Sequence, residues 1–329
     1  MQTNINWGII GLGNIADLFA KDLALVETTK LIAVASRNQT KADQFAQKHQ
    51  AAKAYGNYEA ILNDPKVDII YIATPHDSHQ SLTIAALKAG KHVLCEKPLA
   101  VNQAQVQKMI KVAQQEGKFL MEAFWSKFNP SVKAALKLVE EGRIGAINYL
   151  NADFTLCCDF TDDSRWYNME LAGGSLLDMG VYPVFLAYNI FGVPEQILAT
   201  ARFHSTGADI QTSAILKYKN GIANILSGFA SESDMVAKIY GTEGRIYLQP
   251  YWHEAQGYTL IEGNWNQGKT IHQPLPTKGK GFTYEIEECL ACIRQGKIQS
   301  PNWTHQNSLE LISIVDEIRR QTGLKYPFE

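Results

Sequence analysis

The sequence has few cysteines, no excess of either charge and no long apolar run, and each shortage excludes a class of protein. Its five cysteines are an odd number and too few to cross-link 329 residues, so we expect reduced thiols. The 31 basic and 33 acidic residues give a net charge of −2, which provides no strong field for nucleic acid or an anionic membrane. The longest apolar runs have the length of a strand, well short of the ~18 residues of a membrane helix. We therefore expect a soluble protein that binds neither nucleic acid nor a membrane.

The first residues of the chain also lack the features of a secretory signal. Residues 1–6 contain no basic residue, the first lysine is Lys21, and glycines interrupt the apolar segment that follows. Together with the reduced thiols, this pattern favours a cytoplasmic location.

Two closely spaced cysteine pairs have the wrong surroundings for a metal site. Cys289 and Cys292 form a C-x-x-C on a predicted helix at 282–294, without a second pair or a preceding strand, so we interpret both as buried helix positions. Cys157 and Cys158 are neighbours on an expected strand and therefore point to opposite faces.

The first ~120 residues alternate short β-branched runs with segments of helical period. A chain of 329 residues, 46% of them apolar, corresponds to about two domains at ~100–200 residues each. This alternation predicts a doubly wound parallel sheet, the Rossmann arrangement. The predicted strands are 6–10, 31–35, 52–55, 67–73, 92–96 and 119–123, and the predicted helices are 14–24, 39–49, 57–63, 78–89 and 102–116.

The rest of the chain predicts a second α/β domain, built on a mostly antiparallel sheet. A helix is expected at 131–141 and another at 174–191, and Asn220-Gly221 is a strong hairpin signal. Two closing helices, 284–294 and 308–321, could return to either domain. We predict domains at 1–123 and 124–329. The predicted strands are 146–156, 196–203, 212–219, 222–229, 237–240, 245–248 and 258–261.

A glycine-rich turn follows the first strand and opens the first helix. Its sequence is Gly11-Leu12-Gly13-Asn14-Ile15-Ala16, a G-x-G-x-x-A motif. The first glycine permits the tight turn, the second lets the backbone approach a pyrophosphate, and the small Ala16 lets helix and strand pack closely. The motif in this context predicts a dinucleotide site.

The tip of the second strand predicts NADP rather than NAD as the preferred cofactor. An acidic residue at this tip binds the ribose 2′-hydroxyl of NAD, whereas a basic one accommodates a 2′-phosphate. Here the chain has Ser36-Arg37, with Lys41 one helical turn further on and no acidic residue at the tip. NAD stays open as a second cofactor.

A lysine follows the fifth strand of the predicted parallel sheet, at the edge where such sheets bind ligands. This lysine, Lys97, lies in Glu96-Lys97-Pro98, and the preceding motifs are Thr74-Pro75, His79 and Gly90-Lys91-His92. Together with the glycine turn, these motifs resemble the glucose-fructose oxidoreductase/inositol dehydrogenase/MocA superfamily. Residues 122–125 and 173–182 resemble its branch of dimeric dihydrodiol dehydrogenases and NADP-dependent xylose dehydrogenases.

The resemblance implies a Rossmann domain followed by an α/β domain whose large open sheet often forms a homodimer or homotetramer. It also implies that Lys97 hydrogen-bonds the reacting oxygen and that the Lys97-Pro98 peptide is cis. Asp178 and Tyr182 match the family's other two polar positions, with Tyr182 as the acid/base. Many relatives have histidine in place of Tyr182, so this chain fits the dihydrodiol and aldose branch better than inositol dehydrogenase.

The spacing of Asp178 and Tyr182 suits a shared task. On an α-helix, residues i and i+4 lie on one face, so both side chains can point at one substrate. When an alcohol is oxidised, a proton leaves the hydroxyl as hydride moves to the nicotinamide, which requires a nearby acceptor. The sequence leaves open whether Lys97 or Tyr182 accepts it.

The loop after the fourth strand is interpreted as part of the nucleotide site. His76, Asp77 and His79 could form a metal-ligand set, but the loop lies on the cofactor side of the sheet and Ser78 is a natural N-cap. We therefore expect Thr74, Pro75, His76 and His79, with Glu96, to line the cofactor, and no metal site.

Aromatic residues are candidates for the wall of a sugar or diol pocket, because such substrates present an apolar face edged with hydroxyls. Trp125 and Phe154 match aromatic positions expected in the dihydrodiol branch, Trp166 is a looser candidate, and Arg165 could add a donor. Trp252 and Phe282 are weaker candidates.

The predicted function is hydride transfer between NADP(H) and a secondary alcohol or hemiacetal of a small sugar or diol, such as xylose or a cyclic trans-dihydrodiol. Two alternatives remain at this point: a non-catalytic dinucleotide sensor on the same fold, and an imine or enoate reductase.

Overall fold

The computed structural model describes residues 4–263 and 268–329, so the first three residues of the stretch weighed as a signal lie outside it. The chain divides into two compact units. The first comprises the chain up to Trp125 together with Lys278–Leu309, and the second comprises Ser126–Thr277 with Glu310–Glu329. The first unit is therefore built from two separate stretches of sequence.

The first unit contains a six-stranded parallel sheet in the order β3-β2-β1-β4-β5-β6. The strand order reverses direction between β1 and β4, and right-handed crossovers place the helices before and after this point on opposite faces. The predicted Rossmann sheet is confirmed. Its strands are β1 (Ile5–Ile10), β2 (Thr29–Ala35), β3 (Lys53–Tyr55), β4 (Ile69–Ile72), β5 (His92–Glu96) and β6 (Leu120–Ala123).

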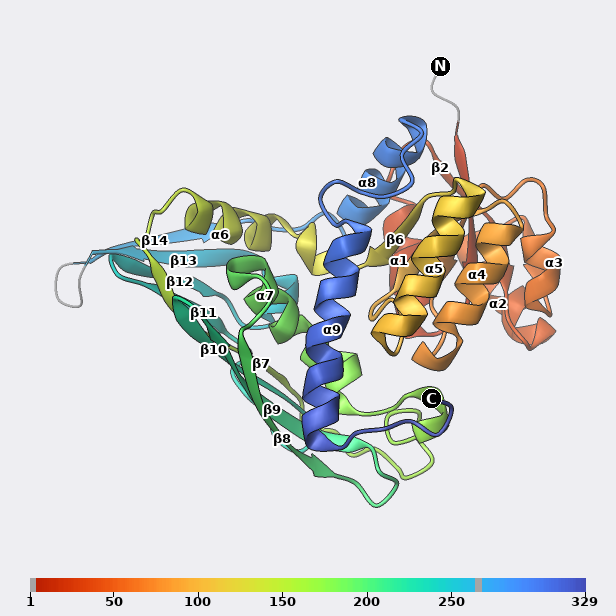
Figure 1. The fold of residues 1–329 in the computed structure, drawn as a ribbon. Helices are drawn as coiled ribbons and strands as arrows, with labels where there is room; N and C mark the ends of the chain where they lie inside the picture. Colours follow the sequence, from red (N-terminus) through yellow and green to blue (C-terminus); the bar gives the residue numbers. More distant parts are fainter. Residues whose placement is uncertain (1–3, 264–267) are drawn as a thin grey trace. The chain divides into compact units, whose positions relative to one another are not determined.

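Three helices of this unit, α2, α3 and α5, begin after an asparagine that caps them. The side chains of Asn38, Asn57 and Asn102 each accept a hydrogen bond from a backbone N–H in the first turn of the helix that follows. Helices α4 and α5 pack against each other (Figure 1). The helices are α1 (Asn14–Leu23), α2 (Gln39–His49), α3 (Tyr58–Leu62), α4 (His79–Lys88), α5 (Gln103–Glu116) and α8 (Thr283–Arg294).

An aromatic cluster joins the two stretches of sequence that form this unit. Phe19 of α1 stacks on Tyr71 of β4 with ring centroids 3.7 Å apart, and Phe282 meets Phe19 edge-on at 6.0 Å. The buried carboxylate of Asp22 accepts hydrogen bonds from the backbone N–H groups of residues 280–282, at 2.8–2.9 Å. Cys289 and Cys292 lie buried on α8, as predicted.

The second unit contains an eight-stranded sheet in the order β14-β13-β12-β11-β7-β10-β9-β8. Every pairing is antiparallel except that of β7 with β10, which confirms a mostly antiparallel sheet. Its edge strand β14 (Lys269–Pro274) was not predicted. The other strands are β7 (Ile147–Thr155), β8 (Gln196–Phe203), β9 (Asp209–Tyr218), β10 (Gly221–Gly228), β11 (Ala237–Gly241), β12 (Gly244–Leu248) and β13 (Gly257–Glu262).

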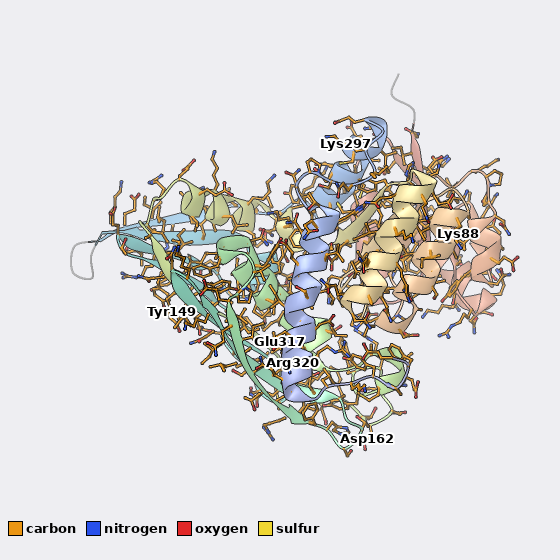
Figure 2. The ribbon with its side chains drawn as sticks, viewed as in Figure 1. Lys88, Tyr149, Asp162, Lys297, Glu317 and Arg320 are labelled. Atoms are coloured by element: carbon orange, nitrogen blue, oxygen red, sulfur yellow. The ribbon has the colours of Figure 1, made fainter. Side chains whose placement is uncertain are left out.

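Helices α6 (Pro130–Glu140) and α7 (Val181–Phe191) pack on one face of this sheet, and the last helix is α9 (His305–Thr322) (Figure 1). On β7, Leu150 is buried, whereas its neighbour Tyr149 points to the other face and stacks on Tyr240 at 5.3 Å (Figure 2). Charged side chains such as Arg320 of α9 are exposed (Figure 2).

The structure differs from the sequence prediction in two places, after the end of β7 and before the start of α7. Cys157 and Cys158 lie beyond the end of β7 rather than on it, and only Cys157 makes an isolated bridge, to Ala230. The predicted helix at 174–191 begins with a π-helical turn, Leu176–Gly180, before α7. Among the described residues, one helical segment, Met169–Phe191, has the length and composition to cross a membrane, but 89% of its apolar window is buried inside the protein.

Candidate functional site

The glycine turn has the geometry that its motif predicts. Gly11 has φ +87°, and a Cβ added there would lie 2.6 Å from the carbonyl carbon and oxygen of Ala73. A Cβ added at Gly13 meets no atom within 4 Å, so the backbone there faces open space. Ala16 is fully buried where α1 packs on the sheet. The turn therefore presents bare backbone at the start of α1, where N–H groups favour an anion.

The tip of β2 is basic and accessible. Ser36 is buried, and its Oγ accepts a hydrogen bond from the backbone N–H of Asn38 at 3.2 Å. Arg37 and Lys41 are exposed. Burial raises the pKa of Tyr58, and the nearby Arg37 guanidinium opposes that rise. A cation thus stands at the position that selects the 2′-substituent of the ribose.

His79 joins the loops that follow β4 and β5. Its Nδ1 lies 2.9 Å from the carbonyl oxygen of Pro98, and its Nε2 lies 2.9 Å from that of Thr74. Burial lowers the pKa of this histidine. The ring is fully buried, and both of its nitrogens face these carbonyl groups. Its role is to hold the two loops together.

Other residues of the loop after β4 keep accessible surface. Thr74 and Pro75 are half-buried, whereas His76 is buried and stands edge-on to His79 at 5.5 Å. Ser78 occupies the N-cap position of α4, but its hydroxyl donates to Thr74 or to the carbonyl of Pro75, each at 2.9 Å. Ser78 is thus the N-cap residue, as predicted, but its hydroxyl fixes the loop and makes no capping hydrogen bond.

Buried carboxylates fix the backbone on both sides of Lys97. Glu96 accepts hydrogen bonds from the Tyr71 hydroxyl and from the backbone N–H of Lys97, the latter at 3.1 Å. Glu122 accepts from the backbone N–H of Leu99 at 2.9 Å. Lys97 is half-buried, and its peptide bond to Pro98 is cis, as the resemblance implied.

Glu122 is itself held in the core of the first unit. Its second oxygen accepts hydrogen bonds from the Ser308 hydroxyl at 2.6 Å and from the Trp303 indole at 3.1 Å. Burial raises the pKa of Glu122, while these donors favour the charged form. The segment that carries Lys97 is consequently anchored to the strand that follows.

In the second unit, Asp178 and Tyr182 lie among aromatic and basic side chains. The ring of Tyr182 is 5.4 Å from that of Phe154 and 5.2 Å from that of His253, and Phe154 stacks on His253 at 4.2 Å. Arg165 forms an ion pair with Asp178, with Nη2 3.5 Å from Oδ1.

The structure brings Phe154, Arg165 and Trp166 into the part of the second unit that carries Asp178 and Tyr182. The guanidinium carbon of Arg165 lies 3.5 Å from the centre of the Trp166 ring. Trp166 is half-buried and packs with a cluster that includes Met179, the residue after Asp178.

The remaining aromatic candidates are core residues. Trp125 belongs to the first unit, where it stacks on Phe282 at 4.7 Å. Trp252 is fully buried, and its indole donates to the carbonyl of Asp153 at 2.8 Å. Sequence reasoning missed His253, because its place beside Tyr182 depends on long-range packing that no local pattern records.

No group of three histidine, cysteine or acidic side chains among the described residues is arranged to hold a metal ion.

Two family models match this chain, one in its N-terminal part and one in its C-terminal part. The model of the oxidoreductase family with an NAD-binding Rossmann fold, GFO_IDH_MocA, matches residues 5–124. The model of the GFO/IDH/MocA C-terminal domain matches residues 132–247. The trans-1,2-dihydrobenzene-1,2-diol dehydrogenase of Mus musculus is 35% identical over 98% of both chains. The chain belongs to the Gfo/Idh/MocA oxidoreductase family.

One further relative and two solved structures are also similar to this chain. The enzyme of the same name from Xenopus tropicalis is 34% identical over 98% of this chain and 99% of its own. A 3-ketoreductase from Actinomadura kijaniata, solved with NADP and TDP-benzene, has a TM-score of 0.88 at 26% identity, covering 97% of this chain and 98% of its own. An aldose-aldose oxidoreductase from Caulobacter crescentus, at 24% identity and a TM-score of 0.87 with the same coverage, shares the fold. The chain is an oxidoreductase, and its first unit is the NAD(P)-binding domain of the family.

Proposed function

We propose that the protein transfers hydride between NADP(H) and the secondary alcohol or hemiacetal carbon of a small polyhydroxy compound. The substrate class is a cyclic trans-dihydrodiol or an aldose such as xylose. The observation that carries the proposal is the half-buried Lys97 at the carboxyl end of β5, in the same unit as the glycine turn of a dinucleotide site. The dihydrodiol dehydrogenases that match this chain over nearly their whole length support the substrate class.

The residues of the first unit fit a dinucleotide, with NADP preferred and NAD as the second choice. Gly11, Gly13 and the start of α1 at Asn14-Ile15-Ala16 would hold the pyrophosphate, because backbone N–H groups are offered there without side-chain obstruction. Ser36, Arg37 and Lys41 would hold the 2′-phosphate. The neighbouring surface of Thr74, Pro75 and His76, with Glu96 and Lys97, would line the nicotinamide half. When bound, this cofactor supplies the hydride acceptor.

The chain's own residues have three tasks in this reaction. Lys97 binds the oxygen whose proton leaves: as a neutral amine it takes that proton itself, and as an ammonium it donates to the oxygen while Tyr182 takes the proton as a phenolate. Asp178 and Tyr182 orient the substrate hydroxyls, and either Lys97 or Tyr182 takes the proton. Arg165 holds Asp178 by their ion pair.

The aromatic residues supply the apolar side of the substrate site. Phe154 and Trp166 would cover the apolar face of a sugar or diol ring. His253 keeps Phe154 in place by stacking on it.

The open face of the large sheet supports a homodimer or homotetramer. Leu198 and Ile215 are directly paired across β8 and β9 and are exposed, as is Ile222 on β10. An apolar row on one face of an open sheet is typical of an interface. We place the protein in the cytoplasm, with neither nucleic acid nor a membrane as a partner.

The test is the Lys97→Met variant, which keeps the length of the side chain and removes its charge. Turnover of an aldose and diol panel, followed by nicotinamide absorbance, is expected to fall by ~10²–10⁴-fold, while NADPH affinity measured by fluorescence stays close to that of the parent. Lys88→Met is the matched control, because Lys88 is an exposed lysine on α4.

Two outcomes would overturn the proposal. Parental kcat in Lys97→Met would remove the catalytic role of the lysine. Binding of NADPH by the parent without turnover of any aldose or diol would favour the sensor, or, if imines or enoates in the panel react, a reductase.

A further inference from the structure

The buried carboxylate of Asp209 accepts hydrogen bonds from the start of the π-helical turn that carries Asp178. Oδ2 of Asp209, the first residue of β9, accepts hydrogen bonds from the Ser175 hydroxyl at 2.7 Å, the Leu176 backbone N–H at 2.9 Å and the Thr212 hydroxyl at 2.7 Å. Asp209 is fully buried and therefore touches no substrate. Ser175 is also 3.0 Å from the hydroxyl of Ser227 on β10. The turn is thus tied to two neighbouring strands.

Glycines at both ends of the turn show how closely it lies against the sheet. A Cβ added at Gly174, where φ is +127°, would be 2.1 Å from Oδ1 of Asp209. A Cβ added at Gly180 would be 2.9 Å from the hydroxyl of Ser227. The backbone can approach Asp209 and Ser227 this closely because both positions lack a side chain.

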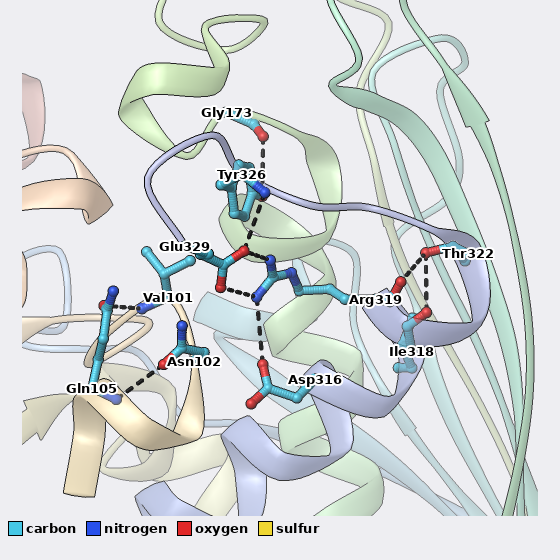
Figure 3. Close-up of polar contacts among 10 residues, drawn as sticks. All are labelled: Val101, Asn102, Gln105, Gly173, Asp316, Ile318, Arg319, Thr322, Tyr326 and Glu329. Carbon is cyan, nitrogen blue, oxygen red and sulfur yellow. Dashed lines mark hydrogen bonds and ion pairs between the residues drawn. The ribbon is translucent and has the colours of Figure 1, made fainter.

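The C-terminal tail holds the approach to the turn from another direction (Figure 3). The buried hydroxyl of Tyr326 donates to the carbonyl of Gly173 at 3.1 Å. Tyr326 packs against Arg319 of α9, whose guanidinium carbon is 4.7 Å from the ring centre. Glu329 accepts from both Arg319 and the backbone N–H of Tyr326, the latter at 3.1 Å. Residues 173–176 are therefore fixed on both sides.

We propose that Asp209 is a positioning residue for the reaction, and that it acts by fixing the start of the turn that places Asp178. The proposal rests on the proposed function, because it requires Asp178 to act on the substrate. A π-helical turn follows a different path from an α-helix, and the contacts at its ends help to set where its side chains point. Asp209 holds one end with two hydrogen bonds, from the Ser175 hydroxyl and the Leu176 backbone N–H.

Two substitutions of Asp209 are expected to lower kcat to different degrees. Asp209→Ala removes the common acceptor and is expected to lower kcat by ~10–100-fold while leaving the Kd for NADPH within about twofold, because a shift of about 1 Å in a reacting group costs up to ~10²-fold. Asp209→Asn retains an oxygen that can accept from Ser175 and Leu176, and is expected to recover most of the activity.

A double-mutant cycle with Asp178→Ala distinguishes a positioning role of Asp209 from a general loss of folded structure. If Asp209 acts through Asp178, then Asp209→Ala costs little further kcat in a chain that already carries Asp178→Ala. Asp64→Ala is the control, since Asp64 is a buried carboxylate that also accepts from three donors, Lys53, Tyr55 and Lys66, and has no part in the proposed site. This control is expected to lower stability and to leave kcat unchanged.

The outcomes distinguish this proposal from the proposed function. Full additivity in the cycle, or parental kcat in Asp209→Ala, overturns the positioning role alone. Parental kcat in Asp178→Ala overturns the role of Asp178 and the positioning role with it. Should Asp209→Ala fail to fold, Ser175→Ala removes one of the three donors and enters the same cycle, with an expected loss of several-fold in kcat and the same criterion of non-additivity.

Discussion

We predict that replacing the buried Glu285 with an apolar residue stabilises the protein. This residue lies in the first turn of α8 and is fully buried, and neither carboxyl oxygen has a hydrogen-bond partner among the described residues. Burial raises its pKa well above 4.5, and the nearby charges of Glu96 and Asp22 raise it further. A buried polar group left without a partner costs ~1–3 kcal/mol. Glu285→Met, which keeps the length of the side chain, is expected to raise the free energy of unfolding at pH 8 by about this amount.

The pH dependence of the effect follows from the direction of the shift. Because the folded pKa is raised, the contribution of Glu285 to stability is fully present below the unfolded pKa of 4.5 and is lost as pH rises through the folded value. The gain from Glu285→Met should therefore be larger at pH 8 than at pH 5. Glu285→Gln cannot ionise and should remove the pH dependence, but it leaves a polar group buried.

Urea unfolding at pH 5 and pH 8, followed by circular dichroism, measures both effects. With m-values of ~1–3 kcal/mol/M, the gain at pH 8 corresponds to a midpoint shift of about 1 M. Glu122→Met is the opposite control, because it leaves three donors without their acceptor and should lower stability. A Glu285→Met protein that is less stable than the parent, or whose gain is the same at both pH values, would refute this reasoning.

Two further predictions concern the cofactor site. Arg37→Ala should weaken NADPH by ~10–100-fold and NADH much less, because the guanidinium pairs only with the 2′-phosphate. Titration with both cofactors checks this, and equal losses would contradict the assignment. Gly11→Ala should lower the thermal midpoint and abolish cofactor binding, since its Cβ would lie 2.6 Å from the backbone of Ala73 at φ +87°. Gly13→Ala has open space and should weaken NADPH without lowering the midpoint, so a parental affinity there would argue against close approach of the pyrophosphate.

The sequence predicted both sheets because their strands differ in pattern from helices: parallel strands such as β4 and β6 are short, fully buried and mostly apolar runs, whereas β9 alternates buried and exposed residues. Helix α2 was predicted with the bounds that the structure shows, 39–49, since an asparagine cap and a helical apolar pattern coincide there. The hairpin at Asn220-Gly221 joins β9 and β10 as expected. Strand β14 was not predicted, because all of its residues except Ile271 are exposed and its side chains show no apolar alternation.

Much of the candidate site depends on contacts that a linear pattern cannot record. The π-helical turn at Leu176–Gly180 has the same residue types as an α-helix, and the carboxylate that binds its first N–H belongs to Asp209, more than 30 residues away. His253 reaches Tyr182 through the packing of segments far apart in the chain. The role of His79 likewise required knowledge of which carbonyl groups surround its ring.

The discontinuous first unit has a consequence for synthesis on the ribosome. Phe282 and the backbone N–H groups bound by Asp22 are translated only after the whole of Ser126–Thr277. A nascent chain that ends near Trp125 therefore exposes the side of α1 that Phe282 covers and leaves a buried carboxylate without its donors. The nucleotide-binding unit can therefore complete its fold only after residues 126–277 have been made.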